Sequence, residues 1–286
     1  MYAITAATGR LGRLVVAALL RNQVPAKQIV AAVRSPDKAA DFAAQGVVVR
    51  KADYDQPETL RTALSGVEKL LLISGDDLGR RVQQHRSVIE AARLAGVRVV
   101  AYTSVLHADS SILVVADTHR RTEAQLKEAG LAYVLLRNGW YLENYTASVP
   151  AVLASGELVG CSGGGQISAA ARVDYAEAAV AALTAADARR ERIYELAGDD
   201  AFTRAEFAAE LSRQSGKTIP YRNLPEEDYR ASLAAAGLPD FIAELLAKLD
   251  AAGARDALFD NGHQLSGLIG RPTTTLSQAI AAALRG

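Results

Sequence analysis

The 286-residue sequence predicts an α/β fold, in which a doubly wound parallel sheet is followed by a smaller C-terminal α/β lobe. Two observations carry this prediction. Short apolar runs alternate with longer amphipathic runs through the first half of the chain, and several amphipathic runs end in glycine just before the next apolar run. Continuous apolar runs are typical of parallel strands buried on both faces, and right-handed crossovers between them leave few layouts besides a doubly wound sheet.

Six strands and five helices alternate in this first part. The strands are predicted at residues 2–7, 29–34, 47–53, 69–74, 98–104 and 133–137, and the helices at 11–21, 36–44, 57–64, 83–95 and 118–129. The first helix carries its apolar residues on one face, at Leu11, Leu14, Val15, Ala18 and Leu19. Four helices are expected to end in a glycine with left-handed backbone, at Gly46, Gly66, Gly96 and Gly130.

After Asn138 the regular alternation fades, which predicts a second, smaller lobe. We therefore divide the chain into a first domain at residues 1–148 and a lobe at 149–286, and leave open that the two are interleaved. The lobe is expected to hold helices at 149–153, 174–185, 204–212, 226–235 and 241–249, a loop at 163–165, a strand at 193–196 and a C-terminal helix at 273–284. Thr275 is the predicted cap of that last helix.

Composition excludes several classes of function. The 32 basic residues balance the 32 acidic ones, so no overall field attracts nucleic acid or an anionic membrane. Cys161 is the only cysteine, which excludes an intrachain disulfide, and the four histidines show no metal-ligand spacing, so we expect no metal. Without a basic leader or a long apolar stretch, the sequence predicts a cytoplasmic protein with no membrane span; a homodimer stays open.

A glycine-bearing turn joins the first strand to the first helix. It consists of Ala6, Ala7, Thr8, Gly9, Arg10, Leu11 and Gly12. Glycines at such a turn let the backbone approach phosphate oxygens, and the helix N-terminus offers unpaired N–H groups and a partial positive charge. The turn therefore predicts a pyrophosphate site, and with it a Rossmann domain that binds a dinucleotide.

The end of the second strand predicts which dinucleotide. An acidic residue there would bind the ribose 2′-OH of NAD, but this chain has Arg34, whose guanidinium can bind a 2′-phosphate. NADPH is therefore the expected cofactor, with Arg10 as a second contact on the turn side. Asp53, at the end of the third strand, faces the adenine edge or caps the turn before Pro57, and the sequence leaves both open.

Two more segments are candidate walls of the site. Ser74, Gly75 and Asp76 end the fourth strand, and ligands of such sheets lie at the carboxyl ends of strands. Residues 137–145 follow the sixth strand and hold the only tryptophan, Trp140. Their rings could stack on a nicotinamide or a planar acceptor, and Asn138 or Asn144 could bind a carbonyl oxygen; the alternative is an aromatic plug between lobes.

The chain lacks the tyrosine and lysine, four residues apart, that familiar reductases of this architecture use to donate a proton. Val115 and His119 stand in the corresponding places. Chemistry that needs a positioned phenol is therefore disfavoured, and an acceptor that takes its proton from water is favoured. His107 and Asp109 with Ser104 or Ser110 suggest a hydrolase, but no nucleophile elbow surrounds either serine.

With these residues the chain resembles the NmrA-like branch of the atypical short-chain dehydrogenases, and within it the type-2 NAD(P)H:quinone oxidoreductases. The likeness runs from end to end. Its specific segments are residues 4–12, 69–74, 101–104, 106–109, 268–275 and, most distinctively, Leu135-Leu136-Arg137-Asn138-Gly139-Trp140-Tyr141. The chain departs from the family at Ala6, where glycine is usual.

The resemblance implies an oxidoreductase that binds NADPH and reduces a quinone or a similar planar acceptor between the lobes. It adds to the cofactor contacts Asn138, Gly139, Trp140, Tyr141, Leu142 and Glu143, with Ala169 at the border. Our leading hypothesis is direct hydride transfer, in which Asn144, Tyr141 and His107 contact the quinol oxygen. The alternative is a regulator that senses NADP without turnover, as some NmrA-like proteins do.

Overall fold

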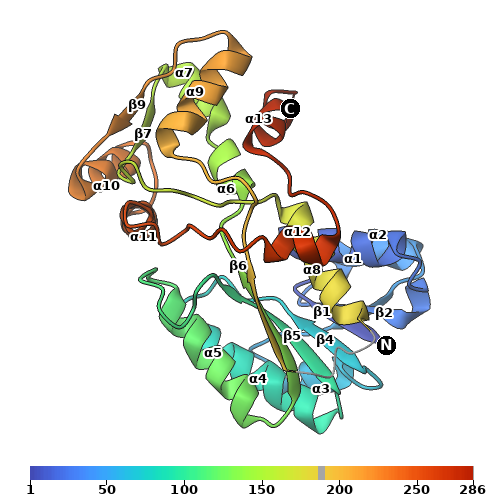
Figure 1. The fold of residues 1–286 in the computed structure, drawn as a ribbon. Coiled ribbons are helices and arrows are strands. Elements are labelled where there is room, and N and C mark those ends of the chain that lie inside the picture. The colour runs from blue at the N-terminus through green and yellow to red at the C-terminus, as the bar shows by residue number, and fades with distance from the viewer. Residues whose placement is uncertain (186–190, 286) are drawn as a thin grey trace. The chain divides into compact units, whose positions relative to one another are not determined.

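The computed structural model describes residues 1–185 and 191–285 and forms two compact units (Figure 1). The first unit consists of Met1–Asp109, Asp117–Asn138 and Arg172–Leu196, and the second of Ser110–Ala116, Gly139–Ala171 and Ala197–Gly286. The units are interleaved in sequence, and the expected boundary at residue 148 falls inside a segment of the second unit.

The first unit is built on a seven-stranded sheet of order β3-β2-β1-β4-β5-β6-β8, and every pair of neighbours is parallel. The strands are β1 (Tyr2–Thr5), β2 (Ile29–Val33), β3 (Val48–Lys51), β4 (Lys69–Leu72), β5 (Val99–Val105), β6 (Ala132–Asn138) and β8 (Arg192–Leu196). The doubly wound sheet and its six predicted strands are confirmed. The strand expected at 193–196 is also present, but it joins this sheet beside β6 and not the smaller lobe.

Helices cover both faces of the sheet (Figure 1). They are α1 (Arg10–Arg21), α2 (Ala40–Ala44) after a 3₁₀ helix at Pro36–Ala39, α3 (Pro57–Ala63), α4 (Arg81–Leu94), α5 (Ala116–Glu128) and α8 (Arg172–Thr184). Helices α1 and α8 pack together on one face, and α3 and α4 on the other. Placing α8 in the smaller lobe was therefore wrong, because its small buried residues pack on the first unit.

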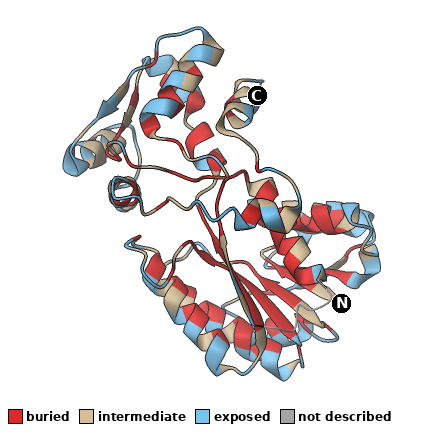
Figure 2. Ribbon diagram, viewed as in Figure 1, coloured by how far each residue is buried: buried red, intermediate tan, exposed pale blue. Residues whose placement is uncertain are grey.

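The core of the first unit follows the period of the strands. Alternate residues of the central strands, such as Leu70 and Leu72 or Val100 and Tyr102, enter one cluster with α3 and α4. Figure 2 shows the central strands of this sheet, β1, β2, β4, β5 and β6, as buried along most of their length. The four predicted cap glycines all have left-handed backbone, with φ between 66° and 82°, and this prediction is confirmed.

The second unit holds α6 (Leu142–Thr146), α7 (Val149–Ser155), α9 (Arg204–Ser215), α10 (Glu226–Ala235), α11 (Asp240–Gly253), α12 (Gln264–Ile269) and α13 (Leu276–Arg285). Two short parallel strands, β7 (Leu158–Gly160) and β9 (Tyr221–Asn223), were not expected. Thr275 caps α13 as predicted, since its Oγ1 accepts from the Gln278 N–H at 3.2 Å. Within the described ranges, no helix has both the length and the apolar character needed to cross a membrane.

Candidate functional site

The strand order reverses between β1 and β4, so the chain crosses to opposite faces of the sheet on either side of this point. Doubly wound sheets bind their ligands at such a switch point, outside the carboxyl ends of the strands. The turn after β1 and the loop after β4 both lie there, in the first unit. The topology therefore places the glycine turn and residues 74–76 at the expected site.

The backbone of the turn after β1 packs closely against the first residues of helix α1. The Gly9 N–H donates to the Ala6 carbonyl at 2.8 Å, and Gly9 forms the N-cap of α1 without a capping side chain. A Cβ on Gly12 would lie 2.4 Å from the Ala6 carbonyl oxygen, so only glycine fits. Helix α1 has no acidic residue in its first turn, and its N–H groups are suited to a phosphate.

Ala6 has left-handed backbone, with φ of +47°. That conformation costs a residue with a Cβ about 1–2 kcal/mol, which explains why glycine is usual at this place in related turns. The carbonyl of Ala6 nevertheless holds the hydrogen bond that closes the turn. The departure at Ala6 thus leaves the turn intact and adds local strain.

Two guanidinium groups are available beside this turn. Arg34 directly follows β2 and Arg10 opens α1; both are exposed, and neither pairs with a residue in the part of the chain that the structure describes. Arg13 is different, because Asp41 holds its Nη1 at 2.6 Å and the Phe42 ring lies 5.0 Å from it. The charge available for a 2′-phosphate therefore resides on Arg34 and Arg10.

Asp53 caps the turn that leads to α3. Its carboxylate accepts from the Asp55 N–H at 3.1 Å and from Gln56 Nε2 at 3.3 Å, and its own N–H donates to Thr59 Oγ1 at 2.9 Å. Asp53 thus has the capping role that the sequence allowed, and its position towards the adenine edge stays a prediction.

The loop after β4 is held by side chains once the strand ends. The Ile73 N–H donates to Thr5 Oγ1 at 3.0 Å, the Tyr54 hydroxyl donates to the Ile73 carbonyl at 3.0 Å, and the Ser74 N–H donates to Thr103 Oγ1 at 2.9 Å. The Tyr54 hydroxyl oxygen also lies 2.6 Å from Thr5 Oγ1, within hydrogen-bond distance, which links the ends of β1 and β4. Sequence reasoning missed Thr5, Tyr54 and Thr103, because single hydroxyls carry no motif.

Asn138 ends β6 with an unsatisfied acceptor. Its side chain is buried, and among the described residues nothing donates to its Oδ1. A buried acceptor without a donor costs about 1–3 kcal/mol, so a ligand N–H would be stabilised there. The Gly12 cradle, the two unpaired guanidinium groups and this oxygen together fit a dinucleotide with an amide-bearing ring.

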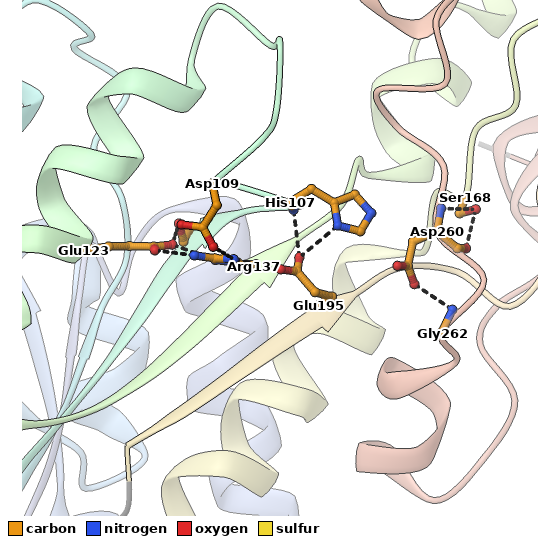
Figure 3. Close-up of polar contacts among 9 residues, drawn as sticks. His107, Asp109, Glu123, Arg137, Ser168, Glu195, Asp260 and Gly262 are labelled. Atoms are coloured by element: carbon orange, nitrogen blue, oxygen red, sulfur yellow. Dashed lines mark hydrogen bonds and ion pairs between the residues drawn. The ribbon is translucent and has the colours of Figure 1, made fainter.

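A cluster of ion pairs around the buried Arg137 lies at the carboxyl ends of β5, β6 and β8 (Figure 3). Arg137 is 4% exposed and binds Glu123 at 2.7 Å, Asp109 at 2.8 Å and Glu195 at 2.9 Å. The Arg137 hydrogen bond holds the pKa of the Asp109 carboxyl below its usual range. The Ser104 hydroxyl donates to Glu123, so it is not paired with a histidine as a hydrolase would need.

His107 lies at the edge of this cluster (Figure 3). Its backbone is left-handed, its N–H donates to Glu195 Oε2 at 2.7 Å, and its Nδ1 lies 3.7 Å from the same oxygen. The ring remains partly exposed. Glu195 thus fixes the backbone of His107 and holds a carboxylate oxygen beside its ring.

His119, which stands where familiar reductases have the lysine, is neutral. His119 is buried, and burial, followed by the charge of Arg81, lowers its pKa to about 3. Its Nε2 accepts from Arg81 at 3.2 Å, which leaves Nδ1–H for the Tyr102 hydroxyl at 2.7 Å. His119 therefore cannot act as the cation that lowers the pKa of a phenol.

The remaining predicted contacts belong to the second unit. Its segments 140–142 and 169–171 lie side by side, because the Leu142 N–H donates to the Ala170 carbonyl at 2.9 Å and the Ala170 N–H donates to the Trp140 carbonyl at 3.2 Å. Ala169 therefore neighbours this aromatic segment. Leu142 is fully buried and serves the core, whereas Asn144 is exposed. The Cys161 thiol is buried, and burial raises its pKa to about 12, as expected for inert packing.

Comparison with known proteins agrees with this geometry. The sequence model of a family described as NAD(P)H-binding matches residues 6–186. The chain belongs to this NAD(P)H-binding family. It is 52% identical to quinone oxidoreductase 2 of Escherichia coli over 98% of both chains. It is also 33% identical to an NmrA-like family domain-containing oxidoreductase of Aspergillus flavus, over 80% of this chain and 76% of that one.

A solved structure extends the likeness to three dimensions. A crystal structure of the E. coli NADPH-dependent quinone oxidoreductase complexed with NADPH is 51% identical to this NAD(P)H-binding chain. It covers 99% of this chain and 100% of its own, with a TM-score of 0.97. The predicted placement among the NmrA-like atypical short-chain dehydrogenases is confirmed.

Proposed function

We propose that this chain is an NADPH-dependent quinone reductase that works by direct hydride transfer without a tyrosine–lysine pair. The observation that carries the proposal is the 52% identity to quinone oxidoreductase 2 over nearly the whole of both chains. The site supports it, since the turn, the unpaired arginines and the Asn138 acceptor suit NADPH. The reaction consumes NADPH, a quinone and one proton, and yields NADP⁺ and a quinol.

NADPH, when bound, supplies the hydride. The protein's part is to bind and orient: N–H groups of the Gly9–Gly12 turn hold the pyrophosphate, Arg34 and Arg10 hold the 2′-phosphate, and Asn138 Oδ1 accepts from an amide. Aligned reactants gain effective molarities on the order of 10⁵–10⁸ M, so alignment can carry most of the rate.

His107 is our proposed proton source for the quinol oxygen, because its partly exposed ring lies beside the Glu195 carboxylate. We keep Tyr141 and Asn144 as proposed contacts of the acceptor. In the first unit, Ser104 is engaged by Glu123 and His119 is buried and neutral, so neither competes for this role.

Stopped-flow mixing of the NADPH-loaded protein with benzoquinones tests the reaction. Oxidation of NADPH well above the uncatalysed rate is expected. A protein that binds NADPH tightly yet leaves the uncatalysed rate unchanged with every quinone would exclude the enzyme and favour a sensor of NADP.

Cofactor selectivity tests the assignment of Arg34. A charge-assisted hydrogen bond to a phosphate contributes about 1.5–3 kcal/mol, so Arg34→Asp should raise the KM for NADPH by roughly tenfold to a hundredfold and leave that for NADH nearly unchanged. Arg61→Asp, at an exposed position of α3, is the matched control. Equal changes for both cofactors would refute the role of Arg34.

A further inference from the structure

We propose that Arg81 and His85, in the first turns of α4, are positioning residues that hold the Gly75 peptide and so preform the cofactor-facing loop after β4. The inference rests on the proposed function in one respect, because it takes residues 74–76 as a wall of the NADPH site. Neither side chain is proposed to touch the cofactor.

Both backbone groups of Gly75 are engaged by α4. The Gly75 N–H donates to His85 Nε2 at 3.1 Å, and Arg81 Nε donates to the Gly75 carbonyl at 2.7 Å. His85 is fully buried and Arg81 is 7% exposed, so solvent does not replace these partners. The N–H and the carbonyl of Gly75 therefore both have partners, although the residue lies outside the sheet.

The protonation state of His85 is fixed by its neighbours. Because Nε2 accepts from Gly75, the ring proton lies on Nδ1, which donates to Thr122 Oγ1 at 3.0 Å; Thr122 in turn donates to the Thr118 carbonyl at 2.9 Å. Burial, followed by the charge of Arg81, lowers the pKa of His85 to about 3. The imidazole is thus a neutral acceptor throughout the range in which the protein would work.

The guanidinium of Arg81 is also held by two side chains of helix α5. Its Nη1 donates to Thr118 Oγ1 at 3.0 Å and to His119 Nε2 at 3.2 Å. The Gly75 peptide is therefore tied through α4 to α5 and, by way of His119 and Tyr102, to β5. A chain of rigid elements holds the loop at one position.

This arrangement affects cofactor affinity through the population of the binding-competent loop. A cofactor that binds only one loop conformation has an apparent Kd equal to its intrinsic Kd divided by the fraction of molecules in that conformation. Loss of the His85 acceptor leaves the Gly75 N–H facing a buried side chain that cannot accept from it, which disfavours the observed loop by roughly 5- to 150-fold. The variant should therefore have a higher apparent Kd for NADPH but an unchanged rate of hydride transfer once NADPH is bound.

The test compares His85→Leu, which removes the acceptor, with His85→Gln, which keeps one. NADPH binding is measured by cofactor fluorescence, and loop opening by hydrogen exchange of residues 73–77 in the cofactor-free protein. His85→Leu should raise the NADPH Kd about tenfold or more and speed exchange, with kcat at saturating NADPH and the quinone KM unchanged. His85→Gln should stay within about threefold of the wild type. Tyr133→Phe, which removes a 3.1 Å hydrogen bond to Glu191 near the other end of the sheet, is the control and should bind normally.

Several results would overturn the proposal. One is a folded His85→Leu protein with wild-type Kd; another is a glutamine variant as weak as the leucine variant. Arg81→Met provides a second variant with the same expectation. Should no variant fold, rapid exchange of residues 73–77 in the cofactor-free wild type would still refute a preformed loop. Failure of the wild type to reduce quinones would refute the proposed function and leave these binding measurements standing.

Discussion

Lowering the pH from about 7.5 to about 5 should destabilise the folded chain by about 2 kcal/mol for each of two buried histidines, His85 and His119. Burial lowers the pKa of both to about 3, and the charge of Arg81 adds to the effect. An unfolded histidine has a pKa near 6.5, so below that pH the unfolded chain takes up protons that the folded chain does not. Their contribution is complete above pH 6.5 and is lost progressively as the pH falls towards 3.

The magnitude follows from proton linkage. At pH 5 the solution is about 1.5 pH units below the pKa of an unfolded histidine, and each such pH unit favours the unfolded chain by about 1.36 kcal/mol. The folded imidazole stays neutral over this range and gains nothing in return. The two histidines together should therefore cost about 4 kcal/mol, which is a large part of the stability of an ordinary domain.

Urea unfolding at a series of pH values measures this effect. His119→Gln should be less stable at neutral pH, but its free energy of unfolding should fall by about 2 kcal/mol less than that of the wild type over the same interval. Val88→Ala, which only opens space in the core near α4, should keep the wild-type pH dependence. Parallel curves for His119→Gln and the wild type would refute the assignment of His119 as a buried neutral group.

Two further outcomes follow from packing. Gly12→Ala should destabilise the protein by about 1–3 kcal/mol and abolish tight NADPH binding, because the new Cβ would meet the Ala6 carbonyl. Thermal melting measures the stability and fluorescence titration measures the binding. A melting temperature equal to that of the wild type would contradict the prediction. Arg137→Met should lower the free energy of unfolding in urea by about 3–5 kcal/mol, because it leaves the Glu123 carboxylate buried without its cation. Adding Glu123→Gln should restore part of this stability. A double variant no more stable than Arg137→Met would show that the ion pair is not the cause.

The parts of the fold that the sequence predicted are those with local signals. Strands such as β4 are apolar throughout, and glycines such as Gly96 occupy left-handed positions that few other residues accept. The strand at β8 was predicted, but nothing local assigned it to a sheet, because it is an edge strand and Ile193 is 45% exposed. Its sequence is compatible with either unit, and its place beside β6 depends on contacts with residues more than fifty positions away.

The same distinction applies to the site. The glycine turn and Arg34 were predicted because strand, turn and helix follow one another directly in the sequence. Arg81 and His85 were not, because their partner Gly75 lies in a loop, and nothing local shows that the first turns of α4 pack beneath it. Four-residue spacing of two polar side chains at buried helix positions was the available signal, and its meaning depends on the neighbouring strand end.

The residues that replace the familiar proton donor also constrain the acceptor. Ser104 donates to Glu123, and Glu123 pairs with Arg137, so both polar side chains are already engaged at the end of β5. His119 is neutral and buried, where related enzymes keep a cation. A ketone needs its oxygen protonated as hydride arrives, and such a site gives it little help. A quinone spreads the incoming charge over a conjugated ring and can take its proton afterwards, from water or from the proposed donor His107, so the proposed hydride transfer to a quinone does not depend on the missing pair.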